Sequence, residues 1–506
     1  MVLRWLYSPA PEYHLVSRVF LRALALIDLA AFASLATQID GLAGSEGLLP
    51  LGSQLDLMLQ QIGNESYWRM PNLFWVYSGD AALTGATWSG CVFAVLLLFN
   101  RLPRLSLIAL FALYLSLFHA GQIFMNFQWD YLLLEAGFLA ILLSLNASRL
   151  VVWLFHWLLF RLRFESGISK LISGDASWAD LGALQYYFET QPLPHWGAWF
   201  AHQLPDWLLR TGAGFVLAAE LLVPFLMFLP RRFRLVAAWV TLLTQFLIVA
   251  TSNHNFFNLL TMALCLFLFD DRALARVLPA RGDADRKAET RPPAVLYRLL
   301  SVALAAVIVA TSTGLMWEMI SGRRLPDSLA SAVGYVRAFG LAQRYHVFPT
   351  IRTERLELVI EGSADGALWK PYGFRYKPQD PGRRPAFIVP HQPRLDWMMW
   401  FVTINLPLNA AWLEGLVHGL FTNAPAVTGL LASNPFAESP PRMIRAQVYR
   451  YRFTSRKERA ATGHWWRREP VGSLIPFPWF NPRSAPPPDA PAASAHGIPR
   501  PGQRWP

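Results

Sequence analysis

The sequence has few charged residues and almost no cysteine. Asp, Glu, Lys and Arg make up 15% of the 506 residues, whereas soluble domains usually contain about 25%. The two cysteines, Cys91 and Cys265, lie in apolar runs, so the chain alone forms neither a disulfide framework nor a zinc cluster. Apolar residues, in contrast, reach 54%, which is too many for an ordinary soluble enzyme. The composition predicts that a membrane is the solvent for this chain.

The common catalytic and nucleotide-binding motifs are also missing. The sequence contains no HExxH, GxSxG, P-loop or GxGxxG string, which excludes the usual hydrolase, NTPase and dinucleotide-binding classes. The net charge of +12 comes from dispersed arginines rather than from one basic patch, which argues against a nucleic-acid partner. We therefore expect no metal site, no cofactor and no nucleic acid.

Apolar runs are instead the dominant feature. A helix that crosses a bilayer needs about 20 mostly apolar residues. The fifth and eighth of the candidate runs are short or interrupted by charge, so the predicted number of spans is eight or nine. The candidate spans cover roughly 16–36, 82–99, 105–120, 128–146, 149–168, 212–229, 233–252, 255–270 and 296–319.

Arginines of the short loops gather on one side of these spans. In a count of nine crossings that side is the cytoplasm, because cytoplasmic loops are enriched in Lys and Arg. The opposite side receives segments 37–80 and 172–211 and the whole chain after residue 320, so we expect a non-cytoplasmic C-terminal domain. The arginines concerned are Arg101, Arg104, Arg149, Arg231, Arg232, Arg234 and those between Arg272 and Arg298.

The chain divides into three predicted regions. Residues 1–320 form a polytopic α-helical membrane bundle, residues 321–482 a β-rich soluble domain with a helical insertion, and residues 483–506 a disordered tail rich in Pro and Ala. Within the domain, alternation of apolar and polar residues favours strands, and helical spacing favours the insertion. We expect strands at 355–363, 372–378 and 444–455, an extended stretch broken by prolines at 383–401, and a helix within 409–433.

Several strings resemble the lipase maturation factor family. They are WDYLLLEAGFLAI at 129–141, LLFRLRFESGISKL at 158–171, YYFETQPLP at 186–194 and KPYGFRYKPQDPGRRPAFIVPHQPRLDWMMWF at 370–401. The resemblance runs from the first predicted helix to about residue 475. It implies a multispanning protein that, in animals, lies in the endoplasmic reticulum membrane and helps secreted lipases to fold and assemble. The short loops and the Ala/Arg-rich sequence suggest a bacterial member, which places it in the inner membrane with its C-terminal domain in the periplasm.

The membrane half is also distantly similar to the helical domain of vitamin K-dependent γ-carboxylases, through GISKL at 167–171. In those enzymes a lysine in a similar setting acts as a base toward a quinol cofactor. The resemblance implies Lys170 as the corresponding residue here. An intramembrane enzyme is therefore the alternative to a maturation factor that is not an enzyme.

Three ionisable residues in or beside the spans are weak catalytic candidates. Glu220 lies inside an apolar run, where a carboxyl group needs a partner in the bundle, either as a structural group or as a functional one. Lys170 and Glu165 belong to a dense set of charges beside the fifth span. Such charges either snorkel to the interface and anchor the helix or provide a base whose pKa is lowered by a dry site.

Other polar residues of the spans receive structural interpretations. Asp130 and Glu135 are five residues apart, so they do not share one helix face as an i, i+4 pair does, and we predict no carboxylate dyad. His254 lies among Asn253, Asn255 and Asn258 between two spans, which favours a polar cap on a helix hairpin over a metal ligand.

Aromatic and basic residues alternate in the C-terminal domain, a composition typical of protein interfaces. Such rings also serve as core or membrane-interface residues. The candidate partner-binding residues are Trp369, Tyr372, Arg394, Trp397 and Trp400.

The leading hypothesis is a membrane-embedded folding or maturation factor. Its expected partners are the lipid bilayer and a secreted client protein, which is a lipase by the family resemblance. The client's identity and the oligomeric state do not follow from the sequence.

Overall fold

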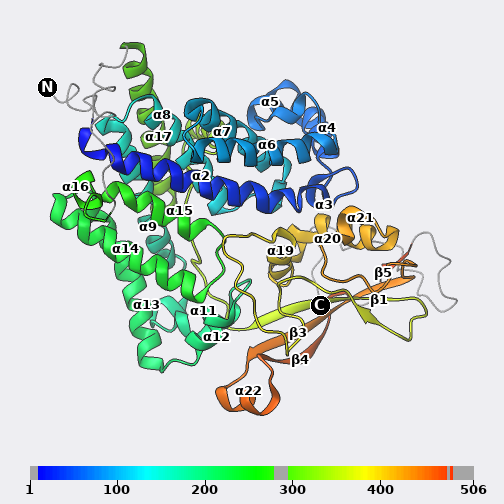
Figure 1. The fold of residues 1–506 in the computed structure, drawn as a ribbon. Coiled ribbons are helices and arrows are strands. Elements are labelled where there is room, and N and C mark those ends of the chain that lie inside the picture. Colours follow the sequence, from blue (N-terminus) through cyan, green and yellow to red (C-terminus); the bar gives the residue numbers. More distant parts are fainter. Residues whose placement is uncertain (1–9, 278–294, 476–478, 482–506) are drawn as a thin grey trace.

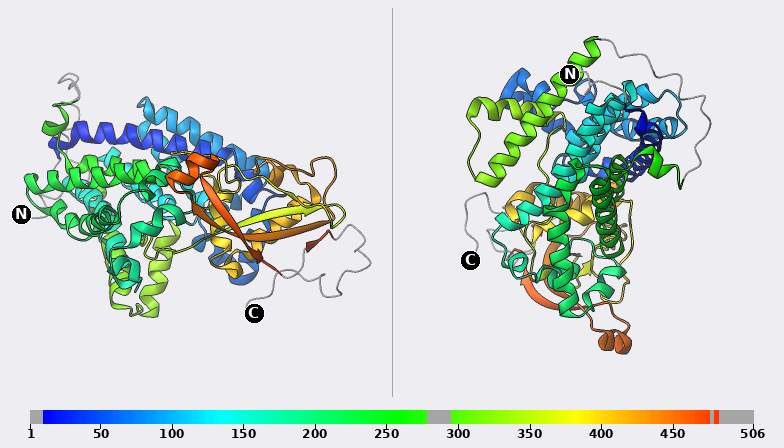
Figure 2. Two further views of the ribbon diagram at one scale, coloured as in Figure 1. Left: turned by 90° about the horizontal axis from the view of Figure 1, so that it is seen from below. Right: turned by 90° about the vertical axis from the view of Figure 1, so that its left-hand side faces the viewer.

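The computed structural model describes residues 10–277, 295–475 and 479–481. The tail predicted at 483–506 lies outside these residues. Figure 1 shows a bundle of long helices at one end of the molecule and a small β-sheet at the other, and the views in Figure 2 agree. The predicted fold class, a polytopic helical bundle followed by a β-sheet domain, is confirmed.

Within the described residues, seven helices are long and apolar enough to cross a membrane. They cover Pro11–Ala36 (containing α2, His14–Ala36), α6 (Asp80–Leu98), α7 (Pro103–Ala120), α8 (Gln128–Leu145), Asp206–Phe228 (α13, Asp206–Leu221, continued by η5, Val223–Phe228), α14 (Arg231–Thr251) and α17 (Val295–Ser321). The two remaining predicted spans are α9 (Arg149–Ile172), which carries several charges, and the short helix Phe257–Leu268, formed by α15 (Phe257–Leu264) and η6 (Cys265–Leu268).

The basic loops meet at the end of the bundle that carries the N-terminus. There the backbone N–H of Ala10 donates to the Ala147 carbonyl oxygen at 3.0 Å, close to Arg149. The N–H groups of Leu15 and Val16 donate to the Asp271 carboxylate, also at 3.0 Å. These bonds satisfy donors that the first turn of a helix leaves free. The C-terminal domain contacts the opposite end of the bundle.

Short helices lie at both ends of the bundle and in the C-terminal domain. The C-terminal part begins with α18, which the sequence analysis did not predict. The shorter helices are η1 (Pro11–Tyr13), α3 (Ile39–Ala43), α4 (Leu51–Ile62), η2 (Gly63–Glu65), α5 (Ser66–Arg69), η3 (Leu73–Trp75), η4 (Gln122–Phe124), α10 (Ala176–Ala179), α11 (Ala183–Thr190), α12 (Trp196–His202), α16 (Asp271–Leu274), α18 (Asp327–Ala338), α19 (Arg394–Val402), α20 (Leu406–Thr422), α21 (Pro425–Thr428) and α22 (Arg456–Thr462).

The sheet is antiparallel, with strand order β2-β1-β3-β4 and β5 paired to β3. Two predicted strands are confirmed as β1 and β3, and the predicted helical insertion as α20. The face of the sheet that carries Leu358, Ile360 and Ala446 belongs to the apolar core that continues into the bundle. The strands are β1 (Arg355–Ser363), β2 (Lys370–Pro371), β3 (Met443–Phe453), β4 (Trp466–Ser473) and β5 (Trp479–Phe480).

Two predictions for the domain are wrong. Segment 372–378 is not a strand, because the N–H groups of Tyr376 and Lys377 donate to Asp396 Oδ1 at 2.7 and 2.9 Å instead of to a neighbouring strand. The stretch 383–401 is not extended throughout, because its last proline is Pro393 and α19 begins at the next residue. A proline is tolerated at a helix start, where its missing N–H costs no hydrogen bond.

Candidate functional site

Several buried polar contacts lie where the C-terminal domain meets the bundle. Arg394, in the first turn of α19, forms a bidentate ion pair with Asp130, in the first turn of α8, with Nη1–Oδ2 and Nη2–Oδ1 distances of 2.8 and 2.7 Å. Nη1 also donates to the Phe124 carbonyl oxygen at 2.9 Å, and the Tyr114 hydroxyl donates to Asp130 Oδ1 at 2.7 Å. Arg394 is 3% exposed and Asp130 0%. The planar guanidinium group matches a carboxylate in this geometry.

A second ion pair holds the chain that follows α18. Arg161 of α9 pairs with Glu135 of α8, and both side chains are fully buried. Arg161 Nη1 also donates to the Gln343 carbonyl oxygen at 3.1 Å. The Tyr345 N–H donates to Glu165 Oε2 at 2.8 Å, and its hydroxyl donates to Glu135 Oε2 at 3.3 Å. The Glu165 carboxylate therefore accepts a hydrogen bond from a backbone N–H group in this structure.

Lys170 and Glu220 form a third buried pair, between α9 and α13. Lys170 Nζ donates to Glu220 Oε2 at 2.7 Å, to the Val347 carbonyl oxygen at 2.9 Å and to the Ser166 carbonyl oxygen at 3.1 Å. Arg163 Nη1 lies 3.4 Å from Glu220 Oε1. The prediction that Glu220 has a partner inside the bundle is confirmed. The interpretation that Lys170 snorkels to the interface is wrong, because its side chain is buried.

Arg355 of β1 occupies a cradle of carbonyl groups from the ETQPLP string. Its guanidinium group donates to the carbonyl oxygens of Glu189 at 3.0 Å and Pro192 at 2.7 Å, and also to that of Gln191. Arg355 Nη2 additionally lies 2.5 Å from Glu357 Oε1. The residues involved are buried or nearly so. This contact fixes the sheet to the segment between α11 and α12.

The loop between α14 and α15 forms the polar cap that the sequence predicted. Asn253 Nδ2 donates to the carbonyl oxygens of Leu193 and Ala386 at 3.1 and 2.8 Å, and its Oδ1 accepts from the Ile388 N–H at 3.0 Å. Among the described residues, no group of three or more His, Cys, Asp and Glu side chains could hold a metal ion.

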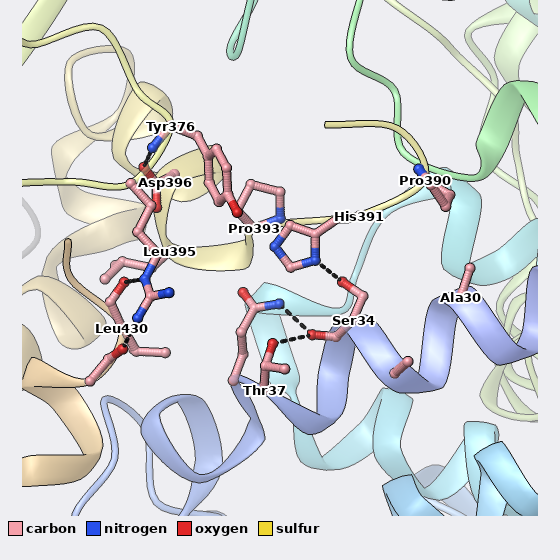
Figure 3. Close-up of a pocket in the computed structure, with 14 residues that line it drawn as sticks. Ala30, Ser34, Thr37, Tyr376, Pro390, His391, Pro393, Leu395, Asp396 and Leu430 are labelled. Carbon is pink, nitrogen blue, oxygen red and sulfur yellow. Dashed lines mark hydrogen bonds between the residues drawn. The ribbon is translucent and has the colours of Figure 1, made fainter. Parts of the chain in front are cut away.

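A cavity of about 430 Å³ with both polar and apolar walls lies between the C-terminal end of α2 and the domain. Figure 3 shows the His391 ring between Tyr376 and the hydroxyl of Ser34, which lies 2.8 Å from His391 Nδ1. Burial, and then the nearby Arg394 and Arg375, lower the pKa of His391. Burial raises the pKa of the Asp396 carboxyl group, against the opposing effect of two backbone N–H groups.

This cavity does not contain a catalytic triad. Within the described residues no hydrogen bond joins Asp396 to His391, because Asp396 Oδ1 is held by backbone N–H groups. The Ser34 hydroxyl accepts from the Gln392 N–H at 3.0 Å. Ser34 therefore links α2 to the domain through hydrogen bonds.

The predicted partner-binding residues do not share one exposed surface. Tyr372, Arg394 and Trp397 are buried, as the alternative interpretation of such residues as core residues expects. Trp369 and Trp400 are half-buried, and Trp400 Nε1 donates to the Thr190 carbonyl oxygen at 2.8 Å. Contact of any of the five with a client stays a prediction.

The interface roles of several ionic residues did not follow from the sequence. Asp130 and Glu135 form no dyad, as predicted, since each carboxylate pairs with its own arginine. Arg355 was not singled out. The available signal was that Asp130, Glu135 and Arg394 all belong to the strings that resemble one family.

The fold and these contacts define a polytopic membrane protein whose C-terminal β-sheet domain is fixed to the helical bundle by buried ion pairs. Residues 15–276 match the family model for the lipase maturation factor transmembrane domain, and residues 341–476 match that for the lipase maturation factor C-terminal domain. The chain therefore belongs to the lipase maturation factor family.

Curated relatives match over most of the chain. Lipase maturation factor 2 of Homo sapiens is 34% identical over 585 residues, covering 91% of this chain and 82% of the relative. Lipase maturation factor 1 of Homo sapiens is 32% identical over 502 residues, covering 90% and 87%. Lipase maturation factor 1 of Bos taurus is 32% identical over 508 residues, covering 92% and 89%. No solved structure matches.

The carboxylase alternative gains no support from these matches. Lys170 donates to a carboxylate and to two carbonyl oxygens, so its present contacts are those of a structural ion pair. Glu165 and Glu220 likewise accept hydrogen bonds from named partners. A catalytic role for any of the three stays a prediction.

Proposed function

We propose that this protein is a membrane-embedded maturation factor that helps secreted proteins, lipases in particular, to reach their active folded state. The observation that carries the proposal is the match to lipase maturation factors across both the bundle and the C-terminal domain. Its membrane is the bacterial inner membrane, with the domain in the periplasm; in a eukaryotic cell the corresponding membrane is that of the endoplasmic reticulum.

The arrangement of the bundle supports this orientation. The basic loops, including Arg149 and Arg231, lie at the end away from the domain. Because cytoplasmic loops are enriched in arginine, the domain belongs to the compartment in which secreted proteins fold. Its buried ion pairs to the bundle hold it at the membrane surface, where a newly translocated client first emerges.

One face of the sheet offers a surface for such a client. Arg445 Cζ lies 4.3 Å from the Trp369 ring centroid, and Arg468 Cζ lies 4.8 Å from that of Tyr449. Aromatic rings beside guanidinium groups provide both apolar area and hydrogen-bond donors, which suits a partly folded polypeptide. We call this surface the sheet patch; it consists of Glu361, Trp369, Arg445, Gln447, Tyr449 and Arg468.

The orientation is tested with reporters fused after residue 340. A reporter that is active only outside the cytoplasm is expected to give signal, and a cytoplasm-only reporter at the same position is expected to give none. The reverse pattern would mean that the domain lies in the cytoplasm and would remove secreted proteins as clients.

The client class is tested in cells that lack this protein. We expect secreted lipases to be exported with several-fold lower specific activity, because their folding is incomplete. Trp369→Ala combined with Arg445→Ala is expected to reduce co-purification of a lipase with this protein. Leu408→Ala, at an exposed apolar residue of α20, is the matched control and should leave co-purification unchanged. Normal lipase activity together with no bound secreted polypeptide would contradict the proposal.

A further inference from the structure

We propose that a second cavity, between α9, α13 and α14, binds an amphiphile that has an apolar acyl chain and an anionic head group. This inference does not depend on the maturation function. It rests on the shape and lining of the cavity, on where it opens, and on unpaired donors of one buried arginine.

The cavity has a volume of about 370 Å³ and mainly apolar walls. Binding sites for small molecules typically measure about 300–1,000 Å³ and combine apolar walls with a few placed polar groups. The interior therefore suits a flexible hydrocarbon chain. The apolar lining includes Leu162, Phe188, Phe215, Val216, Ile248 and Phe257.

The mouth of the cavity is apolar as well. Leu204, Leu208 and Leu247 line it and are 40%, 37% and 46% exposed. Leu208 and Leu247 belong to the candidate spans Asp206–Phe228 and Arg231–Thr251. Exposed leucines on spanning helices face the acyl chains of the bilayer, since lipid is their solvent. An apolar tail can therefore enter from the membrane without crossing water.

The polar wall of the cavity has more positive than negative charge. Arg163 and Lys170 line it together with a single carboxylate, that of Glu220. The Lys170 ammonium group has three oxygen acceptors. Arg163, in contrast, reaches Glu220 only through Nη1, at 3.4 Å.

Arg163 is the group that points to an anionic ligand. Its side chain is 5% exposed, and within the described residues Nε and Nη2 have no hydrogen-bond partner. Nε1 of Trp178, which also lines the cavity, has none either. A buried charged donor without an acceptor is costly. A carboxylate or phosphate oxygen placed in the cavity would accept from these donors and balance the excess charge.

The test measures binding of tritiated oleate, tritiated phosphatidylglycerol and tritiated oleyl alcohol to the purified full-length protein in detergent. Oleate carries a carboxylate and phosphatidylglycerol a phosphate, whereas oleyl alcohol has an apolar chain but no anionic head. We expect saturable binding of at least one anionic probe and about tenfold or more weaker binding of the alcohol. Whichever anionic probe saturates identifies the source of the head group.

Variants of the protein test separately how the head group and the apolar tail contribute to binding. Arg163→Gln is expected to lower the affinity for the anionic probe about tenfold or more, while Arg163→Lys is expected to retain part of that affinity. Ile248→Trp enlarges an apolar side chain of the cavity lining and should abolish saturable binding. Val236→Trp, at an exposed residue of the same helix outside the cavity lining, is the control and should bind as the parent does. Binding that never saturates, that is equal for oleyl alcohol, or that survives both Arg163→Gln and Ile248→Trp would overturn the proposal.

Discussion

Arg394→Met is expected to destabilise the protein by about 3–5 kcal/mol, because it leaves the Asp130 carboxylate buried without its partner. The same change removes the donor to the Phe124 carbonyl oxygen. The free energy of unfolding is measured in detergent, and trypsin cleavage within 341–476 reports release of the domain. Faster cleavage in this region should accompany the lost stability.

A double variant measures what the ion pair between Asp130 and Arg394 contributes to stability. Replacing both charges by apolar side chains, with Asp130→Leu and Arg394→Met, is expected to recover much of the stability, since no buried charge is then unpaired. Arg450→Met is the matched control: its ion pair with Glu354 is partly exposed and should change the stability by about 1 kcal/mol or less. Equal losses for Arg394→Met and Arg450→Met would mean that the buried pair does not hold the domain.

The four sequence strings that resemble the family meet at one interface. Asp130 and Glu135 come from the first string, Arg161 from the second, the Arg355 cradle from the third and Arg394 from the fourth. These strings are far apart in the chain and have little in common in composition. Their shared property is that each supplies a residue to a buried polar contact between the first 320 residues and the chain after residue 340. In this protein the strings therefore contain residues that join the two parts.

Local patterns explain which parts of the fold could be predicted. Apolar runs mark the spans because each span satisfies its own backbone in lipid. Alternation of apolar and polar residues marks β3, and an apolar run marks β1, which is buried on both faces. The prediction of an extended stretch at 383–401 is wrong for its last part. The prolines end at Pro393, and α19 begins at the next residue.

The candidate site could not be predicted from local patterns. Arg394 and Asp130 are 264 positions apart, and nothing near either residue in the sequence indicates the other. The same limit explains the wrong interpretation of Lys170 as an interface anchor and why the burial of Trp397 did not follow from the sequence. Their composition fits an exposed anchor or an interface, and only the packing of distant segments shows that both are buried.

Arg355→Met is the second change with a large expected effect, again a loss of about 3–5 kcal/mol. The methionine cannot donate to the carbonyl oxygens of Glu189, Gln191 and Pro192. Among the described residues it leaves Glu357 with only one charged partner, Lys377, whose Nζ lies 3.1 Å from Glu357 Oε2. Buried carbonyl groups without donors add to the cost of the lost charge pair.

The loss of stability should be concentrated at β1 and at residues 189–192, whose carbonyl groups Arg355 binds. Hydrogen exchange of the β1 amides is expected to accelerate in Arg355→Met, whereas the bundle amides of α2 and α8 keep their protection. Arg445→Met removes an arginine from the same sheet, but its pair with Glu361 is partly exposed, so stability should fall by about 1 kcal/mol or less. If Arg355→Met were as stable as Arg445→Met, the ETQPLP cradle would contribute no more than a surface contact, and the domain would have to be held by its other buried contacts, such as the ion pair of Arg394, and by the apolar core.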